Sequence, residues 1–151
     1  MGRKITMGWF NREEKKEVLS KIPSEMSPIE SVTYLCTAVQ ISDGQVDMEE
    51  RNVWIELVSE LFPEFSEKRA NNFFSEAQLA LHSKSKNERK LFTVEVINRI
   101  KNLLDTEQVN ILGRKIADLV EADGMVMSGE IEIIELIQKH LKIKINFDSE
   151  L

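Results

Sequence analysis

An acidic turn that contains a glycine occurs twice in this chain, and the spacing of the two copies constrains the fold more than any other feature. The first copy lies in residues 39–50 and the second in residues 119–130. Four residues of the first copy recur 80 positions later as the same residue type. Asp43, Gly44, Val46 and Glu50 correspond to Asp123, Gly124, Val126 and Glu130. Apolar residues at helical spacing flank both copies. The chain is therefore predicted to hold two units of helix, acidic turn and helix, related by a pseudo-two-fold repeat.

Proline, serine and acidic residues mark where the predicted helices begin. Ser27, Pro28 and Glu30 supply an N-cap, a proline at the first helical position and a capping-box acid, so a helix is expected from 28 to about 42. Its predicted apolar face consists of Ile29, Val32, Leu35, Cys36 and Val39. Comparable signals predict helices at 9–21, about 48–61, from Ser66 to about Leu81, about 88–104, from Asp105 to about 121, and from Ser128 to Leu141.

No segment predicts a pair of strands, so the expected fold class is all-α, a compact bundle of about seven helices. One domain is predicted at residues 7–142, with 1–6 and 143–151 as terminal extensions. The polar run Ser83–Asn87 is interpreted as a solvated joint between the two halves rather than a phosphate site.

Composition excludes several classes of protein. The net charge of −6 argues against a nucleic-acid partner, since such binding depends on Lys and Arg. No apolar run reaches the roughly 18–20 residues of a membrane span. The single cysteine, Cys36, cannot form an internal disulfide, which favours a cytoplasmic location, and its apolar surroundings predict a buried, inert thiol.

The acidic turns match only the second half of a calcium-binding EF-hand loop. Asp43, Gly44 and Glu50 occupy the fifth, sixth and twelfth positions of the template. The first and third positions hold Val39 and Ile41 in one copy and Leu119 and Glu121 in the other. Neither turn alone is therefore expected to bind Ca²⁺, which takes six to eight oxygen ligands.

Together the two turns could form one site. If the repeat brings them side by side, four carboxylates converge, those of Asp43, Glu50, Asp123 and Glu130. Such a cluster would need a cation to neutralise it, and its hard oxygen ligands favour Ca²⁺, Mg²⁺ or Mn²⁺.

A second interpretation of the same acids is structural. Asp47 can serve as an N-cap with Glu50 at the reciprocal capping-box position, and acids in a first helical turn suit the helix dipole. Asp43 and Asp123 would then close Asx-type turns. The sequence leaves both interpretations open.

The motif Asp-Gly-x-Val-x-x-Glu-Glu at 43–50, its counterpart Ala-Asp-Gly-x-Val-x-x-Gly-Glu at 122–130 and the opening Met7-Gly8-Trp9-Phe10 resemble the TerB-like family. That family is associated with tellurite resistance and is also found near the DjlA co-chaperones. The resemblance covers roughly residues 7–142 and implies a pseudo-symmetric helical domain, metal-binding acids and a role in stress response.

Carried onto this chain, the metal ligands that the resemblance implies are Asp43, Glu50, Asp123 and Glu130. The chain departs from the pattern at Ser42, where the first turn lacks Ala, and at Gly129, where the second lacks an acid. The loss of that acid is interpreted as weakening the second half-site by one ligand.

Motifs for catalysis are lacking in the sequence. It has no P-loop or G-x-G-x-x-G, no nucleophile beside a base, and no Glu three residues before either histidine, as a di-iron bundle would need. The expected function is a non-enzymatic, metal-responsive module that binds a protein partner. The alternatives are a metal-independent structural adaptor and, ranked below it, a carboxylate-metal hydrolase.

Overall fold

The computed structural model describes residues 22–42, 48–122 and 128–147, and the regular elements in these ranges are all helical. They are η1 Pro23–Glu25, α2 Pro28–Ile41, α3 Met48–Leu61, α4 Glu67–His82, α5 Lys86–Leu103, α6 Thr106–Glu121 and α7 Ser128–Leu141. The predicted all-α class is confirmed, with six α-helices in the described ranges. The helix expected at 9–21 lies outside them, so the total of about seven stays a prediction.

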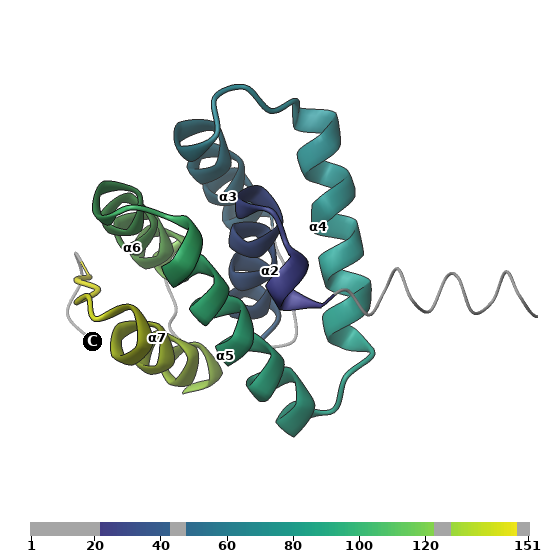
Figure 1. Cartoon of the computed structure of the whole chain (residues 1–151), viewed down its shortest axis with the longest axis vertical. Helices are drawn as coiled ribbons and strands as arrows, with labels where there is room; N and C mark the ends of the chain where they lie inside the picture. Colours follow the sequence, from purple (N-terminus) through teal and green to yellow (C-terminus); the bar gives the residue numbers. More distant parts are fainter. Residues whose placement is uncertain (1–21, 43–47, 123–127, 148–151) are drawn as a thin grey trace, which may run out of the picture.

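Helix α2 is the centre of the molecule. Its start is the predicted capping box, in which the Glu30 backbone N–H donates to Ser27 Oγ at 3.3 Å and the Ser27 N–H donates to Glu30 Oε1 at 3.0 Å. Helix α2 contacts each of the other five α-helices. Figure 1 shows it with α4 on one side and with α6 and α7 on the other.

The predicted apolar face of α2 packs into the core, with Val32, Leu35, Cys36 and Val39 buried and Ile29 packed against them. Burial also extends around the rest of the helix from Glu30 to Ile41, which was not predicted. Thr37, on another side, is completely buried and donates a hydrogen bond to the Thr33 carbonyl at 2.7 Å. Contact with five neighbouring helices therefore extends burial beyond the predicted face.

Side-chain caps also begin the next helices along the chain. Ser66 Oγ accepts a hydrogen bond from the Arg69 N–H at the start of α4, as predicted. Ser85 and Glu88 form a capping box that begins α5 at Lys86. Lys86 and Asn87 are therefore helical, and the prediction that the polar joint extends to Asn87 was wrong because this capping box was overlooked.

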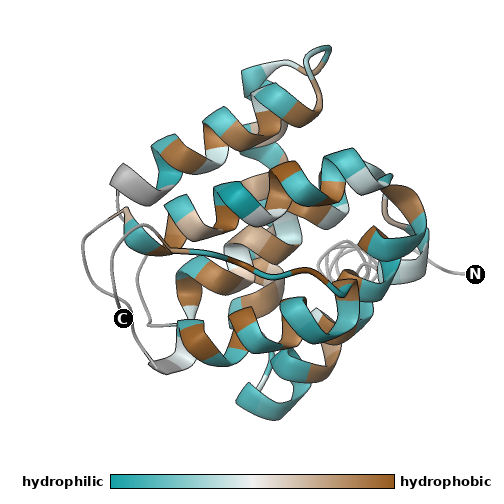
Figure 2. Cartoon of the chain, turned by 90° about the vertical axis from the view of Figure 1, so that its left-hand side faces the viewer, coloured by the Kyte–Doolittle hydropathy of each residue, from teal (hydrophilic) through white to brown (hydrophobic). Residues whose placement is uncertain are grey.

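The core collects apolar side chains from all six α-helices, and Figure 2 shows hydrophilic residues largely on the outward sides of the helices. Trp54 of α3 stacks near Phe74 of α4, with ring centroids 4.7 Å apart. Ile145, in the irregular segment after α7, is also buried, and its N–H donates to Gln138 Oε1 at 2.8 Å. Cys36 is buried as predicted, and burial raises the pKa of its thiol to about 12.

No helix in the described ranges has both the length and the apolar character needed to cross a membrane.

Candidate functional site

The helices that flank the two acidic turns end and begin at matching positions. Helix α2 ends at Ile41, and α6 ends 80 residues later at Glu121. Helix α3 begins at Met48, and α7 begins 80 residues later at Ser128. The residues that end α2 and α6 also share a conformation. Ser42 and Ala122 are both right-handed helical, and their N–H groups donate to the carbonyls of residues 39 and 119 at 3.3 and 3.4 Å.

The start of α7 lies against the end of α2. A Cβ atom built on Gly129 would be only 2.7 Å from the carbonyl oxygen of Ser42 and 3.3 Å from its carbonyl carbon. Ser42 directly precedes Asp43 in the first copy, and Gly129 directly precedes Glu130 in the second. The residues next to these two acids are therefore in contact.

This contact gives a physical reason for the departure of the second copy from the first. The first copy has Glu49 at the position that corresponds to Gly129. A side chain at position 129 would displace the backbone of Ser42, which directly follows α2. The sequence interpretation treated the glycine only as a missing ligand. The structure adds that glycine is what allows α2 and α7 to approach so closely.

Glu130 is the one predicted metal ligand whose side chain the structure describes. It is the third residue of α7, and only 1% of its surface is exposed. A buried carboxylate is stable only if hydrogen bonds or a positive charge compensate for its lost hydration. The start of a helix supplies N–H groups and the positive end of the dipole, and a bound cation would supply charge.

The other three predicted ligands are not placed. Asp43 and Asp123 lie outside the described residues, as does the side chain of Glu50, although Glu50 is the third residue of α3 just as Glu130 is of α7. Within the described side chains, which omit these three, no group of three His, Cys, Asp or Glu residues is arranged to hold a metal ion.

Three other helices show what an acid or amide at the third position can do. Glu30, Glu88 and Gln108, at the third positions of α2, α5 and α6, each accept a hydrogen bond from the N-cap backbone N–H, at 3.0, 2.9 and 2.9 Å. Hydrogen bonds with Ser85 lower the pKa of Glu88 below its ordinary value. Capping is therefore an established use of this helix position in the molecule.

Gln40 was not identified from the sequence as a functional residue. Its side chain is completely buried at the penultimate position of α2, and neither its Oε1 nor its Nε2 has a hydrogen-bond partner in the described part of the chain. The residue 80 positions later is Val120, which is apolar and also completely buried. Buried polar groups are normally hydrogen-bonded, so a buried amide without partners in the described residues is a candidate ligand-binding group.

A single amide between Val39 and Ile41 is the signal that the sequence contains for Gln40. It was not interpreted, because the predicted apolar face of this helix did not include Gln40.

Comparison of the chain with protein-family models, with curated proteins and with solved structures found no match.

Proposed function

We propose that this protein is a non-enzymatic helical module of the TerB-like kind, which acts in a cytoplasmic stress response by binding a protein partner. A hard divalent cation, Ca²⁺, Mg²⁺ or Mn²⁺, joins its two acidic turns through Asp43, Glu50, Asp123 and Glu130. The two units form a pseudo-two-fold repeat, and the cation fixes their relative tilt and hence the surface offered to the partner.

The close approach of Gly129 to Ser42 is the observation that carries this proposal. Asp43 follows Ser42 in the chain and Glu130 follows Gly129, so each acid is one residue from the contact. Consecutive Cα atoms are only about 3.8 Å apart. Acids from the two turns are therefore available to a single cation.

One further feature supports a cation. The amide oxygen of Gln40 is an uncharged oxygen donor of the type that Ca²⁺ accepts beside carboxylates, and it lacks a partner in the described residues. A cation held by both units would act as a cross-link between α2–α3 and α6–α7.

Thermal unfolding with and without metal tests the proposal. At millimolar Ca²⁺, Mg²⁺ or Mn²⁺ the melting temperature should rise, because a ligand at 100 times its Kd stabilises the folded state by about 2.7 kcal/mol. For a chain of this size, that corresponds to roughly 5–11 °C. The double variant Asp43→Asn, Asp123→Asn should lose the rise.

A matched control removes two acids elsewhere. Glu95 and Glu135 are exposed on α5 and α7, so Glu95→Gln with Glu135→Gln changes the net charge equally and should keep the metal response. An unchanged melting temperature of the parent protein in all three metals would reject the proposal.

The capping boxes of α2, α5 and α6 favour a second candidate, a metal-independent structural adaptor whose turn acids are helix caps. In that case Asp47→Ala should lower the free energy of unfolding by about 0.5–2 kcal/mol, and metal should have no effect.

The variant Glu50→Gln separates the two functions, because Gln108 shows that glutamine can close a capping box in this protein. If Glu50 is only a structural cap, the melting temperature of this variant should change little, with or without metal. If Glu50 is a metal ligand, the melting temperature without metal should be kept, and the rise on adding metal should become smaller.

A further inference from the structure

A cavity of about 190 Å³ lies where the end of α2 meets the first halves of α5 and α7. Its apolar lining includes Ala38, which is buried, and Ile133 and Leu136, which are partly buried. Its basic lining comes from one stretch of α5, Lys86, Arg89 and Lys90. The cavity therefore combines an apolar surface with a cluster of positive charge.

The described lining of this cavity is opposite in charge to the whole protein. The chain has 26 acidic and 20 basic residues, whereas the described lining has three basic residues and one acid, Glu132. Lys90 Nζ lies 3.7 Å from Glu132 Oε2, so these two charges largely offset each other. Among the described lining residues, Lys86 and Arg89 therefore leave a net positive charge.

Arg89 has a structural role that leaves part of its guanidinium group available. Its Nε donates to the Leu81 carbonyl at 3.0 Å and its Nη2 to the Lys84 carbonyl at 3.4 Å, which holds the group at the end of α4. A guanidinium has five N–H donors, so others remain for a ligand. Lys86 is exposed and takes part in no ion pair with the described residues.

The size of the cavity limits what it can hold. At about 30 Å³ per molecule in the liquid, its volume corresponds to roughly six waters. Pockets for drug-sized ligands are larger, at about 300–1,000 Å³. The cavity itself therefore holds a compact molecule or group.

We infer that this cavity binds a small phosphate monoester, with the phosphate beside Lys86 and Arg89 and a compact apolar body against Ala38, Ile133 and Leu136. A phosphate monoester carries close to two negative charges at neutral pH, opposite in sign to the net charge of the described lining. All the residues involved lie in the described ranges. The lining also includes Ser42 and Gly129, so the cavity borders the contact next to the acidic turns.

Titration of the full chain with phenyl phosphate, followed by backbone amide NMR shifts in the presence of a chelator, tests the inference. The chelator removes any metal that could bridge phosphate to the acidic turns, so binding seen under these conditions does not depend on the proposed cation. Phenyl phosphate should give saturable shifts within 86–93 and 129–136, and it should bind more tightly than inorganic phosphate or phenol.

Single substitutions then assign the binding to the cavity. Lys86→Ala should weaken binding of phenyl phosphate by about two- to fivefold, the range expected for one partly exposed charge contact. Glu132→Gln should strengthen it by a similar factor, because it releases Lys90 and removes the competing anion. Lys101→Ala, an exposed lysine in the last turn of the same helix, is the matched control and should have no effect.

Three results would overturn the inference. These are no saturable shift at millimolar phenyl phosphate, shifts confined to other parts of the chain, and equal affinities for the parent, Lys86→Ala and Glu132→Gln. Lys86 is exposed at the first position of α5, so its substitution leaves the core intact and these results can be interpreted.

Discussion

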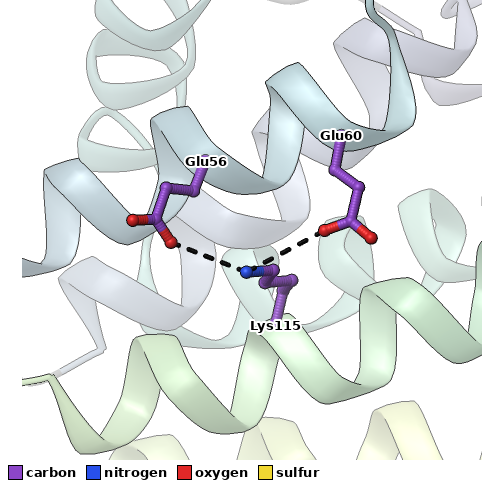
Figure 3. A network of polar contacts seen from close by, with 3 residues as sticks. All are labelled: Glu56, Glu60 and Lys115. Atoms are coloured by element: carbon purple, nitrogen blue, oxygen red, sulfur yellow. Dashed lines mark ion pairs between the residues drawn. The ribbon is translucent and has the colours of Figure 1, made fainter.

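The contacts α2–α7 and α3–α6 join helices whose bounds at the acidic turns lie 80 residues apart in the sequence, but the two contacts are built differently. Between α2 and α7, the backbone of Gly129 approaches the carbonyl of Ser42 so closely that a Cβ atom would be 2.7 Å from it. Between α3 and α6, Lys115 Nζ points between two acids and lies 3.5 Å from Glu56 Oε1 and 3.9 Å from Glu60 Oε1 (Figure 3).

The two features differ in how closely they bring backbone atoms together. At Gly129 and Ser42 the approach is so close that no side chain fits between them, and we call this the rigid contact. The ion pairs are partly solvated, with the Glu56 side chain 68% and the Glu60 side chain 44% exposed, and such pairs contribute little and tolerate movement. The rigid contact is the one that adjoins the acidic turns.

The largest effect is expected for Gly129→Ala, which breaks the rigid contact. The added methyl group must displace the Ser42 backbone, and overpacking of this kind costs about 1–3 kcal/mol. Alanine also favours the helix over glycine by about 0.5–1 kcal/mol, so the free energy of unfolding should fall by up to about 2.5 kcal/mol in urea denaturation.

The matched control is Gly113→Ala in α6. There the new Cβ atom would meet only Ile143 Cδ1, at 3.0 Å, and the end of that side chain can move. The free energy of unfolding should change by less than about 1 kcal/mol. If both alanine variants were equally stable, the steric account of the α2–α7 contact would be wrong.

A smaller effect is expected for Lys115→Gln, which removes the ionic contact between α3 and α6. The free energy of unfolding should fall by at most about 1 kcal/mol. The difference from the parent should shrink as ionic strength rises from about 0.05 to about 0.5 M, because salt screens exposed charges. If Lys115→Gln lowered the free energy of unfolding more than Gly129→Ala does, the ion pairs would contribute more to stability than the rigid contact, and the expected order would be wrong.

The smallest effect on stability is expected at the start of α5. Glu88 is the third residue of α5, as the buried Glu130 is of α7, but Glu88 is exposed. The Ser85 backbone N–H and hydroxyl stabilise the ionised carboxylate and lower the pKa of Glu88. A lowered folded-state pKa gives a stabilisation that is complete above the unfolded-state pKa and is lost as pH falls through the folded-state pKa.

The variant Glu88→Gln isolates this contribution, since its side chain does not titrate. The stability of the parent relative to Glu88→Gln should decline as the pH is lowered from about 6 to about 3 in chemical denaturation. Parallel pH profiles for the two proteins would show that the capping hydrogen bond does not favour the charged form.

Much of the helical organisation could be predicted because the capping residues are local. Ser27 and Glu30 predict the start of α2, and Asp105 and Gln108 that of α6, and both capping boxes are formed. The start of α5 was misplaced only because the basic residues around Ser85 obscured the same signal.

The environment of each helix depended on contacts that local patterns do not contain. The sides of α2 outside its predicted apolar face are also buried, because α2 has helical neighbours on every side. Gln40 illustrates the limit: the sequence shows an amide between Val39 and Ile41 but does not show whether that amide finds a partner.

The candidate sites were predictable to different degrees. The repeat drew attention to the acidic turns, but the approach of Ser42 to Gly129 joins residues 87 positions apart and is a tertiary property. Residues of α2, α5 and α7 line the basic cavity, and these helices are far apart in the sequence. From the sequence alone, the run that contains Lys86 was therefore interpreted as a solvated segment.

The central position of α2 bears on how the protein is made. Its last residue, Ile41, precedes the last residue of α7, Leu141, by 100 positions, and all five helices that cover it follow it in the chain. During synthesis, α2 therefore leaves the ribosome before the last of these helices has been made, with apolar surface open to aggregation and to chaperones. Burial of α2 is complete only when α7 has emerged.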